Sequence, residues 1–313
     1  MKVILSRKGF DSAVGGFASP ILADGSLISL PIPATDPRED YRIHYSELHY
    51  DSNRTILDLL KSMNGMEIKA KGKWKNAGLC SAHLDPDLRF ESYSRRTDWR
   101  GLFGIDGKSQ SNIDKNFGVD GEDGVDIGDL FLFFGWFEEY KQKGNSLVNE
   151  ENRKDFPSGR HVIFGYLQVG EILPIWRMEK TDKRILSWMD YHQHIAENRR
   201  LVGDDYFGKN TLYVATERLT FAPEQHGFGV FRYTDKSAER LVLTKKGQTR
   251  TRWELPEAFI TPRKVKISWN PNGWETWAKN GYFQSSHRGQ EFVVQETPQI
   301  REWAESLVQE LWR

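Results

Sequence analysis

A carboxylate and two cations lie close together after the first apolar segment, in the sequence RKGFDS of residues 7–12. Arg7 and Lys8 favour the ionised form of Asp11. An ionised carboxylate can activate water and can balance the positive charge that develops on a sugar as its glycosidic bond breaks. Gly9 would let the backbone approach a phosphate or an everted nucleotide. The alternative is a charged turn in which Asp11 caps the next segment.

A second group alternates along the sequence HLDPD of residues 83–87. In an extended backbone, His83, Asp85 and Asp87 point to the same side of the chain. They could pair a general acid with a base, or bind a divalent ion through imidazole and carboxylate oxygens. The sequence shows no further cluster of His and Cys, so we predict catalytic roles for these three residues and no metal. A tight turn stabilised by the aspartates is the structural alternative.

A third group follows the same alternation in SWMDYHQHI, where Asp190 precedes His192 and His194. In an extended segment the two histidines would face one side and could contact a base or a phosphate. Isolated histidines are also common as core or solvated residues. We predict substrate or DNA contacts for His192 and His194.

Near the end of the chain, a polar segment of residues 285–291 precedes an apolar stretch. Arg288 could bind a phosphate through two parallel hydrogen bonds, and Gln290 could read the edge of a base. The structural alternative is that both residues tie the last strand to the terminal helix. We predict a role for both in substrate binding.

Lysine plus arginine and aspartate plus glutamate each number 44, so the formal net charge is zero. Any contact with nucleic acid must therefore come from local basic segments rather than from a global field. Trp74 lies within one basic segment and Trp253 beside another, an arrangement typical of sites that combine backbone contacts with base stacking. We predict Trp74 as a stacking residue, although basic segments are often only solvated faces. The basic segments are residues 69–75, which we expect to form a loop, and residues 199–200, 245–252 and 263–266.

The elements that must position these residues are mostly strands. Residues 129–137 and 161–172 are apolar on both faces, which predicts two central strands of a sheet. Apolar spacing in residues 298–313 predicts an amphipathic helix that packs across this sheet. We expect an α+β fold with a β-rich central sheet, in which residues 1–313 form one compact unit with sub-lobes 1–100 and 101–313. Other predicted elements are strands at 1–5 and 211–221, a helix within 46–60, and hairpins at 21–32 and 228–244.

Composition limits the compartment and the class of protein. Cys80 is the single cysteine, so no internal disulfide can form. The longest apolar run, residues 130–137, is far shorter than the roughly 20 residues that cross a bilayer. We therefore expect a cytoplasmic protein with no membrane contact. The motifs of P-loop, Rossmann, serine-hydrolase and zinc-protease sites are missing, which disfavours those chemistries and predicts no cofactor.

Several segments, in their joint order, resemble the third nucleotide-modification-associated domain family, which occurs in phages and bacteria beside DNA-modification or defence genes. The segments are residues 6–16, 18–33, 82–88, 128–137 and 288–293. The resemblance implies a role in making, reading or removing unusual DNA bases. The two apolar strands also resemble, more weakly, those of PUA-like barrels, which implies a closed barrel as the alternative form of the sheet.

With this resemblance, we predict a DNA glycosylase that flips a hypermodified pyrimidine, for example a glycosylated hydroxymethyl base, out of the duplex and excises it in anti-phage defence. Its partner would be DNA with modified bases. Two alternatives are an enzyme that builds the modification and a non-catalytic reader with aromatic cage residues such as Trp136 or Phe137. A protein-interaction module is a further alternative.

Overall fold

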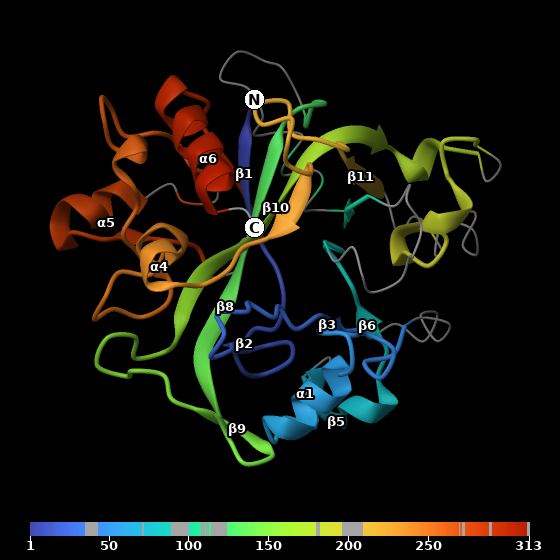
Figure 1. Cartoon of the computed structure of the whole chain (residues 1–313). Helices are drawn as coiled ribbons and strands as arrows, with labels where there is room; N and C mark the ends of the chain where they lie inside the picture. Colours follow the sequence, from blue (N-terminus) through green and yellow to red (C-terminus); the bar gives the residue numbers. More distant parts are fainter. Residues whose placement is uncertain are drawn as a thin grey trace.

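The computed structural model describes residues 1–34, 43–70, 72–88, 100–107, 110, 113, 124–179, 182–195, 209–268, 270, 273–287 and 290–311. These parts form a mixed α+β structure around one large sheet (Figure 1). The predicted fold class is therefore confirmed. Among the described residues the sheet does not close into a barrel, so the PUA-like alternative is not found.

Two strands of 14 residues each form the centre of the sheet. They are β8 (Leu130–Lys143) and β10 (Arg160–Leu173), and they pair antiparallel. Their apolar side chains are buried on both faces, as a central position in a sheet requires. This confirms the two central strands that the sequence predicts.

The sheet continues on both sides of this pair. On one side, β1 (Val3–Arg7) runs parallel to β8, and β15 (Glu291–Val294) pairs antiparallel with β1. On the other side, β11 (Thr211–Ala215) pairs with β10, and β7 (Leu102–Ile105) lies at the edge. Three further strands pair with the long strands: β2 (Ser19–Ile21), β9 (Ser146–Asn149) and β12 (Phe228–Val230).

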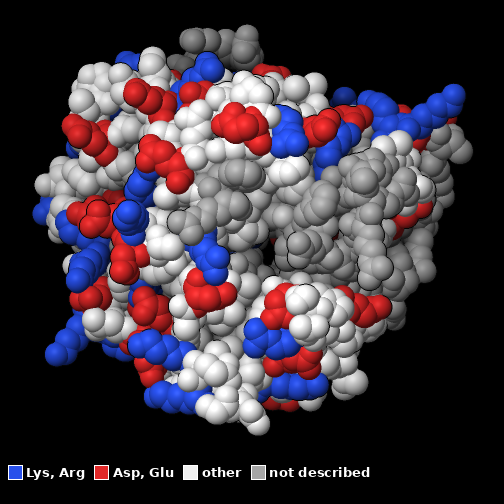
Figure 2. Space-filling view, viewed as in Figure 1, with Lys and Arg blue, Asp and Glu red and all other residues white. Residues whose placement is uncertain are grey.

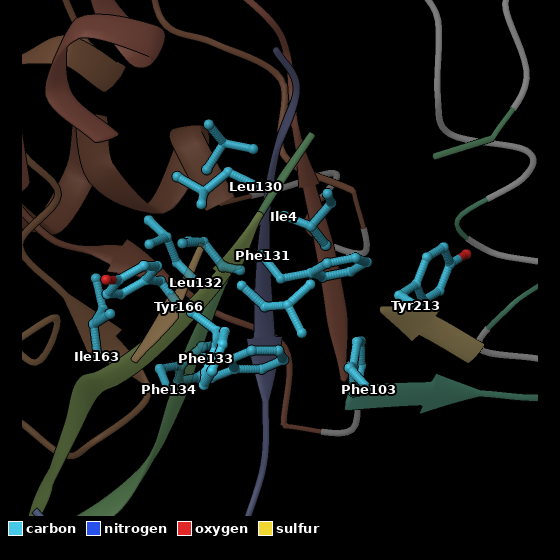
Figure 3. Packing of buried hydrophobic residues seen from close by; sticks show 14 of the residues in the cluster. Ile4, Phe103, Leu130, Phe131, Leu132, Phe133, Phe134, Ile163, Tyr166 and Tyr213 are labelled. Atoms are coloured by element: carbon cyan, nitrogen blue, oxygen red, sulfur yellow. The ribbon is translucent and has the colours of Figure 1, made fainter. Parts of the chain in front are cut away.

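Aromatic rings fill the main core beside the sheet (Figure 3). Phe103 packs edge to face against Phe131 and Phe133, with 4.9 Å between ring centroids in each pair. The predicted amphipathic helix is present as α6 (Pro298–Leu311), and it buries Ile300 and Leu307 in the same core. Each buried aromatic ring removes a large apolar surface from water, so these rings contribute strongly to the stability of the core.

A second, smaller core is built mostly from residues of the N-terminal part of the chain. It surrounds α1 (Ile56–Ser62), which begins with a capping box between Thr55 and Asp58. Tyr140 of β8 joins this core, so the long strand links the two cores. Whether residues 1–100 and 101–313 behave as separate sub-lobes stays a prediction.

Two local predictions were wrong. The second strand of the hairpin expected at residues 228–244 is instead the helix α4 (Asp235–Leu241), because Thr234 and Ser237 form a capping box that starts a helix. The basic segment 69–75 is a hairpin of β4 (Glu67–Ala70) and β5 (Lys73–Asn76) rather than a loop.

Short elements complete the described structure, and none of its helices is long and apolar enough to cross a membrane. The remaining strands are β3 (Ile32–Pro33), β6 (Ala82–His83), β13 (Arg252–Trp253) and β14 (Phe283–Gln284), and the remaining α-helix is α5 (Gly273–Asn280). Short 3-10 turns lie at Ala77–Leu79, Ile175–Arg177, Ser187–Met189 and Glu257–Phe259.

Candidate functional site

A cavity of about 240 Å³ opens where β1 ends, and it is lined by residues from segments far apart in the sequence. Its walls come from residues 7–14, from the end of β6 and Asp85 after it, from the paired strands β8 and β10, and from residues 250–251, 287 and 290. Six of the predicted site residues line it: Arg7, Lys8, Asp11, His83, Asp85 and Gln290. The fold thus brings together residues that the sequence places in three separate groups.

One side of the cavity carries what we call the arginine cluster, which consists of Arg7, Arg250 and His161. The Arg7 guanidinium donates to the backbone oxygen of His287 at 2.9 Å, and Arg250 donates to Ser12 Oγ at 3.2 Å. Burial lowers the pKa of both arginines, and Asp11 opposes this shift in each case. Both remain cations at neutral pH, because an arginine does not lose its proton in proteins.

His161 is a buried residue of this cluster that we did not predict. Trp253 Nε1, which can only donate, lies 3.0 Å from His161 Nδ1. Nδ1 therefore accepts, and the proton of the neutral ring is on Nε2. Burial, together with the charges of Arg7 and Arg250, holds the pKa of His161 well below its ordinary value. No sequence signal marks His161, because it sits inside an apolar strand.

Trp136 also lines this side of the cavity. The Arg250 guanidinium lies over its ring, 4.1 Å from the ring centroid. Phe137, the neighbouring residue, is fully buried in the core. Of the two aromatic residues expected in a reader, only Trp136 therefore reaches the cavity. Trp253 is fully buried as well.

The position of Asp11 allows both of the roles that the sequence left open. Its Oδ1 accepts hydrogen bonds from the backbone amides of Ala13, at 2.7 Å, and Val14, at 2.8 Å, so the carboxylate does cap a turn. Asp11 is also half-buried and lines the same cavity as the two arginines. Its catalytic role stays a prediction.

The other side of the cavity carries what we call the histidine cluster, which consists of His83, His192 and His194 around Asp85. Asp85 Oδ1 accepts a hydrogen bond from the backbone amide of Gly104 at 2.8 Å. Burial acts to raise the pKa of Asp85, but His192, Lys8 and His194 outweigh it and hold the pKa below its ordinary value. Asp85 is therefore ionised at neutral pH.

His192 and His194 are buried behind Asp85 rather than exposed to the cavity. Their Nε2 atoms lie 3.6 Å and 3.9 Å from the Asp85 carboxylate oxygens. His194 packs on Gly104, where a Cβ would come within 2.1 Å of the imidazole ring. Burial lowers the pKa of His194, and the nearby Asp85 opposes this shift.

Lys8 lies between the two clusters. Its Nζ is 3.1 Å from Glu291 Oε1 and 4.4 Å from the centroid of the Phe103 ring. The carboxylate of Glu291 is 1 % exposed, so the pair is buried. Lys8 therefore lines the cavity as one half of a buried ion pair, and its charge is balanced by Glu291.

The remaining predicted residues are placed elsewhere. Asp87 is fully buried and accepts a hydrogen bond from the Tyr191 hydroxyl at 3.0 Å, so it does not share the cavity with His83 and Asp85. Trp74 lies on β5 and is 55 % exposed. Its ring packs so closely against Gly16 that a Cβ at that position would touch it. Arg288 lies outside the described residues.

Acidic and basic side chains are intermixed over the described part of the face in Figure 2, in keeping with the zero net charge. Of the four basic segments, the cavity takes Arg250 from residues 245–252. A cation inside a cavity acts at close range and is screened less than a surface charge. The positive charge of the site therefore comes from cations inside the cavity rather than from a basic patch on the surface.

Comparison with known proteins gives one match. The model of nucleotide modification associated domain 3 matches residues 2–295, a range that includes every described segment lining the cavity. No curated protein and no solved structure matches the chain. The chain belongs to the family of nucleotide modification associated domain 3.

Proposed function

We propose that the cavity receives a modified nucleotide flipped out of DNA, and that the protein hydrolyses its glycosidic bond and releases the modified base. The observation that carries this proposal is that the Asp11 carboxylate lines one cavity together with Arg7, Arg250 and the Trp136 ring. Family membership supports the link to nucleotide modification.

The arginine cluster suits the binding half of this function. Two guanidinium groups and a neutral imidazole that donates through Nε2 offer hydrogen bonds to phosphate oxygens or to hydroxyl groups of a base modification. Trp136 offers a face for stacking, as base-flipping enzymes commonly use. A cavity lined in this way selects for a nucleotide with extra polar groups.

Asp11 suits the chemical half. Its Oδ1 is held by two backbone amides, which leaves Oδ2 for a water molecule or for the sugar. In the reaction, the bond between C1′ and the base breaks with its electron pair leaving on the base, and water supplies a hydroxyl to C1′ and a proton to the base. A fixed carboxylate stabilises the positive charge that develops on the sugar.

The test uses purified protein with unmodified DNA and with DNA that carries hydroxymethylated or glucosylated pyrimidines. Free base is measured by mass spectrometry, and abasic sites are counted by alkaline cleavage. We expect release from modified DNA alone. Asp11→Asn should reduce release at least about 100-fold, because an amide oxygen can keep the turn but lacks the charge.

Asp24→Asn is the matched control, because Asp24 Oδ1 caps a similar turn, with Ser26 N at 2.9 Å, and does not line the cavity. It should release base at the wild-type rate. Full activity of a folded Asp11→Asn protein would remove Asp11 from the proposal. If no DNA substrate releases base, the glycosylase proposal fails.

A modified-base reader is the second candidate, favoured by Arg250 stacked on Trp136. A reader would bind modified DNA without releasing base. It would retain this binding in Asp11→Asn and lose it in Trp136→Ala, which separates it from a glycosylase.

A further inference from the structure

The histidine cluster contains a set of metal-ligand atoms that the proposed reaction does not use. One ligand atom each from His83, Asp85 and His194 lies within 4.8 Å of the other two. The His83 and His194 rings meet edge to face with 6.1 Å between centroids. Two imidazoles and one carboxylate therefore converge on one point beside the cavity.

The hydrogen bonds around His194 fix which nitrogen faces this point. Asn210 Nδ2 donates to the His194 backbone oxygen at 2.9 Å, which sets the orientation of the amide. Asn210 Oδ1 then accepts from His194 Nδ1 at 2.6 Å. The lone pair of the neutral ring is consequently on Nε2, which faces Asp85. Histidines that bind metals are commonly oriented by such a bond from the other ring nitrogen.

The carboxylate of Asp85 is held in a similar way. Its Oδ1 accepts from the Gly104 amide, while Oδ2 faces His194 Nε2 at 3.9 Å. Four ligands at about 2.1 Å from a tetrahedral ion lie roughly 3.4 Å apart, so small side-chain rotations bring these atoms onto one ion. Gly104 supplies both the amide and, by lacking a side chain, the room for His194.

His192 is a second, independent sign that a ligand belongs here. Its side chain is fully buried, and neither ring nitrogen has a hydrogen-bond partner in the described structure. Its Nε2 lies 3.6 Å from Asp85 Oδ1, beyond hydrogen-bond distance. A buried polar group without a partner is costly, and a metal ion or a water bound to it would provide one.

We propose that His83, Asp85 and His194 bind one divalent transition-metal ion, with its open coordination positions toward the cavity. Two imidazoles with one carboxylate are a donor set that iron(II) and zinc accept, whereas magnesium and calcium prefer oxygen ligands. We predicted no metal because the sequence shows no further cluster of His and Cys, and His194 joins residues 83–85 only through the fold. This inference is independent of the glycosylase proposal, since metal binding is measured without any DNA.

The first experiment uses full-length protein without a histidine tag, stripped of metal by a chelator. Equilibrium dialysis against zinc, anaerobic iron(II), cobalt(II) or magnesium is followed by elemental analysis. We expect one equivalent of each transition metal and no binding of magnesium at the same concentration. The transition metal that binds most tightly of the three is the ion that the site prefers. A folded wild-type protein that takes up none of the three transition metals would overturn the proposal.

Variants then locate the ion. His83→Ala, Asp85→Asn and His194→Ala should each weaken binding about 100-fold or more, and Asn210→Leu about 10- to 100-fold, because it only orients His194. His287→Ala is the matched control, since His287 lines the same cavity outside the cluster. If a variant folds poorly, the cobalt(II)-loaded wild-type protein still tests the proposal. Its visible absorption reports imidazole ligands directly, without any substitution. Unchanged binding in folded His83→Ala and His194→Ala proteins would place the ion elsewhere and refute the assignment.

Discussion

The arginine cluster and the histidine cluster adjoin the same cavity, but each surrounds a buried histidine with charges of opposite sign. His161 lies among cations, and both burial and these charges lower its pKa. His194 lies beside a carboxylate that works against the effect of burial. The comparison teaches that the hydrogen-bond partner of Nδ1, as well as the neighbouring charges, decides what a buried imidazole can do. His161 donates through Nε2 because Trp253 donates to its Nδ1, whereas His194 offers a lone pair on Nε2 because Asn210 accepts from its Nδ1.

The largest effect should come from filling the space that the histidine cluster needs. Gly104→Ala would place a Cβ 2.1 Å from the His194 ring, in a buried strand that cannot move freely. Overpacking of this kind costs about 1–3 kcal/mol of unfolding free energy. Urea unfolding measures the loss, and cobalt binding should weaken in the same variant.

Gly78→Ala is the control for this substitution, because the nearest atom to its Cβ is the end of the Asn76 side chain at 3.1 Å. Gly78→Ala should lower the unfolding free energy far less than Gly104→Ala. Equal losses of unfolding free energy in the two variants would mean that the close contact between Gly104 and His194 is not the cause of the loss.

A smaller effect should appear as pH dependence in the arginine cluster. The folded-state pKa of His161 is below its unfolded value, so the unfolded state binds a proton first as pH falls. Stability is then fully present above pH about 6.5 and declines below it by up to about 1.4 kcal/mol per pH unit, until the folded pKa is reached. Urea unfolding from pH 7.5 to pH 5 records this slope.

His161→Asn should flatten the slope, because asparagine keeps an acceptor for Trp253 but does not titrate. His49→Asn, at an exposed histidine outside both clusters, should leave it unchanged. If the slope of His161→Asn equals that of the wild type, the acid sensitivity arises from other groups.

The smallest effect concerns the charge of the arginine cluster. If the cavity receives a nucleotide, Arg250→Gln should weaken binding of modified DNA and reduce the dependence of log affinity on log salt by about one unit. Fluorescence anisotropy across a salt series gives this slope. Arg301→Gln, on the exposed face of α6, should change neither quantity. A salt slope that Arg250→Gln leaves unaltered would separate the arginine cluster from phosphate binding.

Much of the fold could be predicted from the sequence, because its strongest signals are local. The apolar runs that became β8 and β10, and the spacing that became α6, need no knowledge of the rest of the chain. The helix α4 was missed because its capping box, Thr234 with Ser237, was outweighed by the apolar residues around it. Local signals fail where two of them compete.

The site was predictable only in part, since its parts meet through tertiary structure. Arg7, Asp11 and Gln290 were found by their residue types, yet nothing in the sequence shows that they share a cavity. The alternation of His83, Asp85 and Asp87 misled us about Asp87, because the chain turns before it and the carboxylate bonds to Tyr191. His161 gave no signal at all.

The pairing of β1 with β15 sets the order in which a newly made chain can complete the cavity. The Arg7 amide donates to the Gln290 oxygen at 2.6 Å, so residues near the two ends of the sequence form one edge of the site. The residues of the histidine cluster and its support at Asn210 leave the ribosome earlier than Arg250 and Gln290. During synthesis, the proposed metal ligands are therefore all available while the cavity is still open on one side, and the cavity closes only when β15 docks.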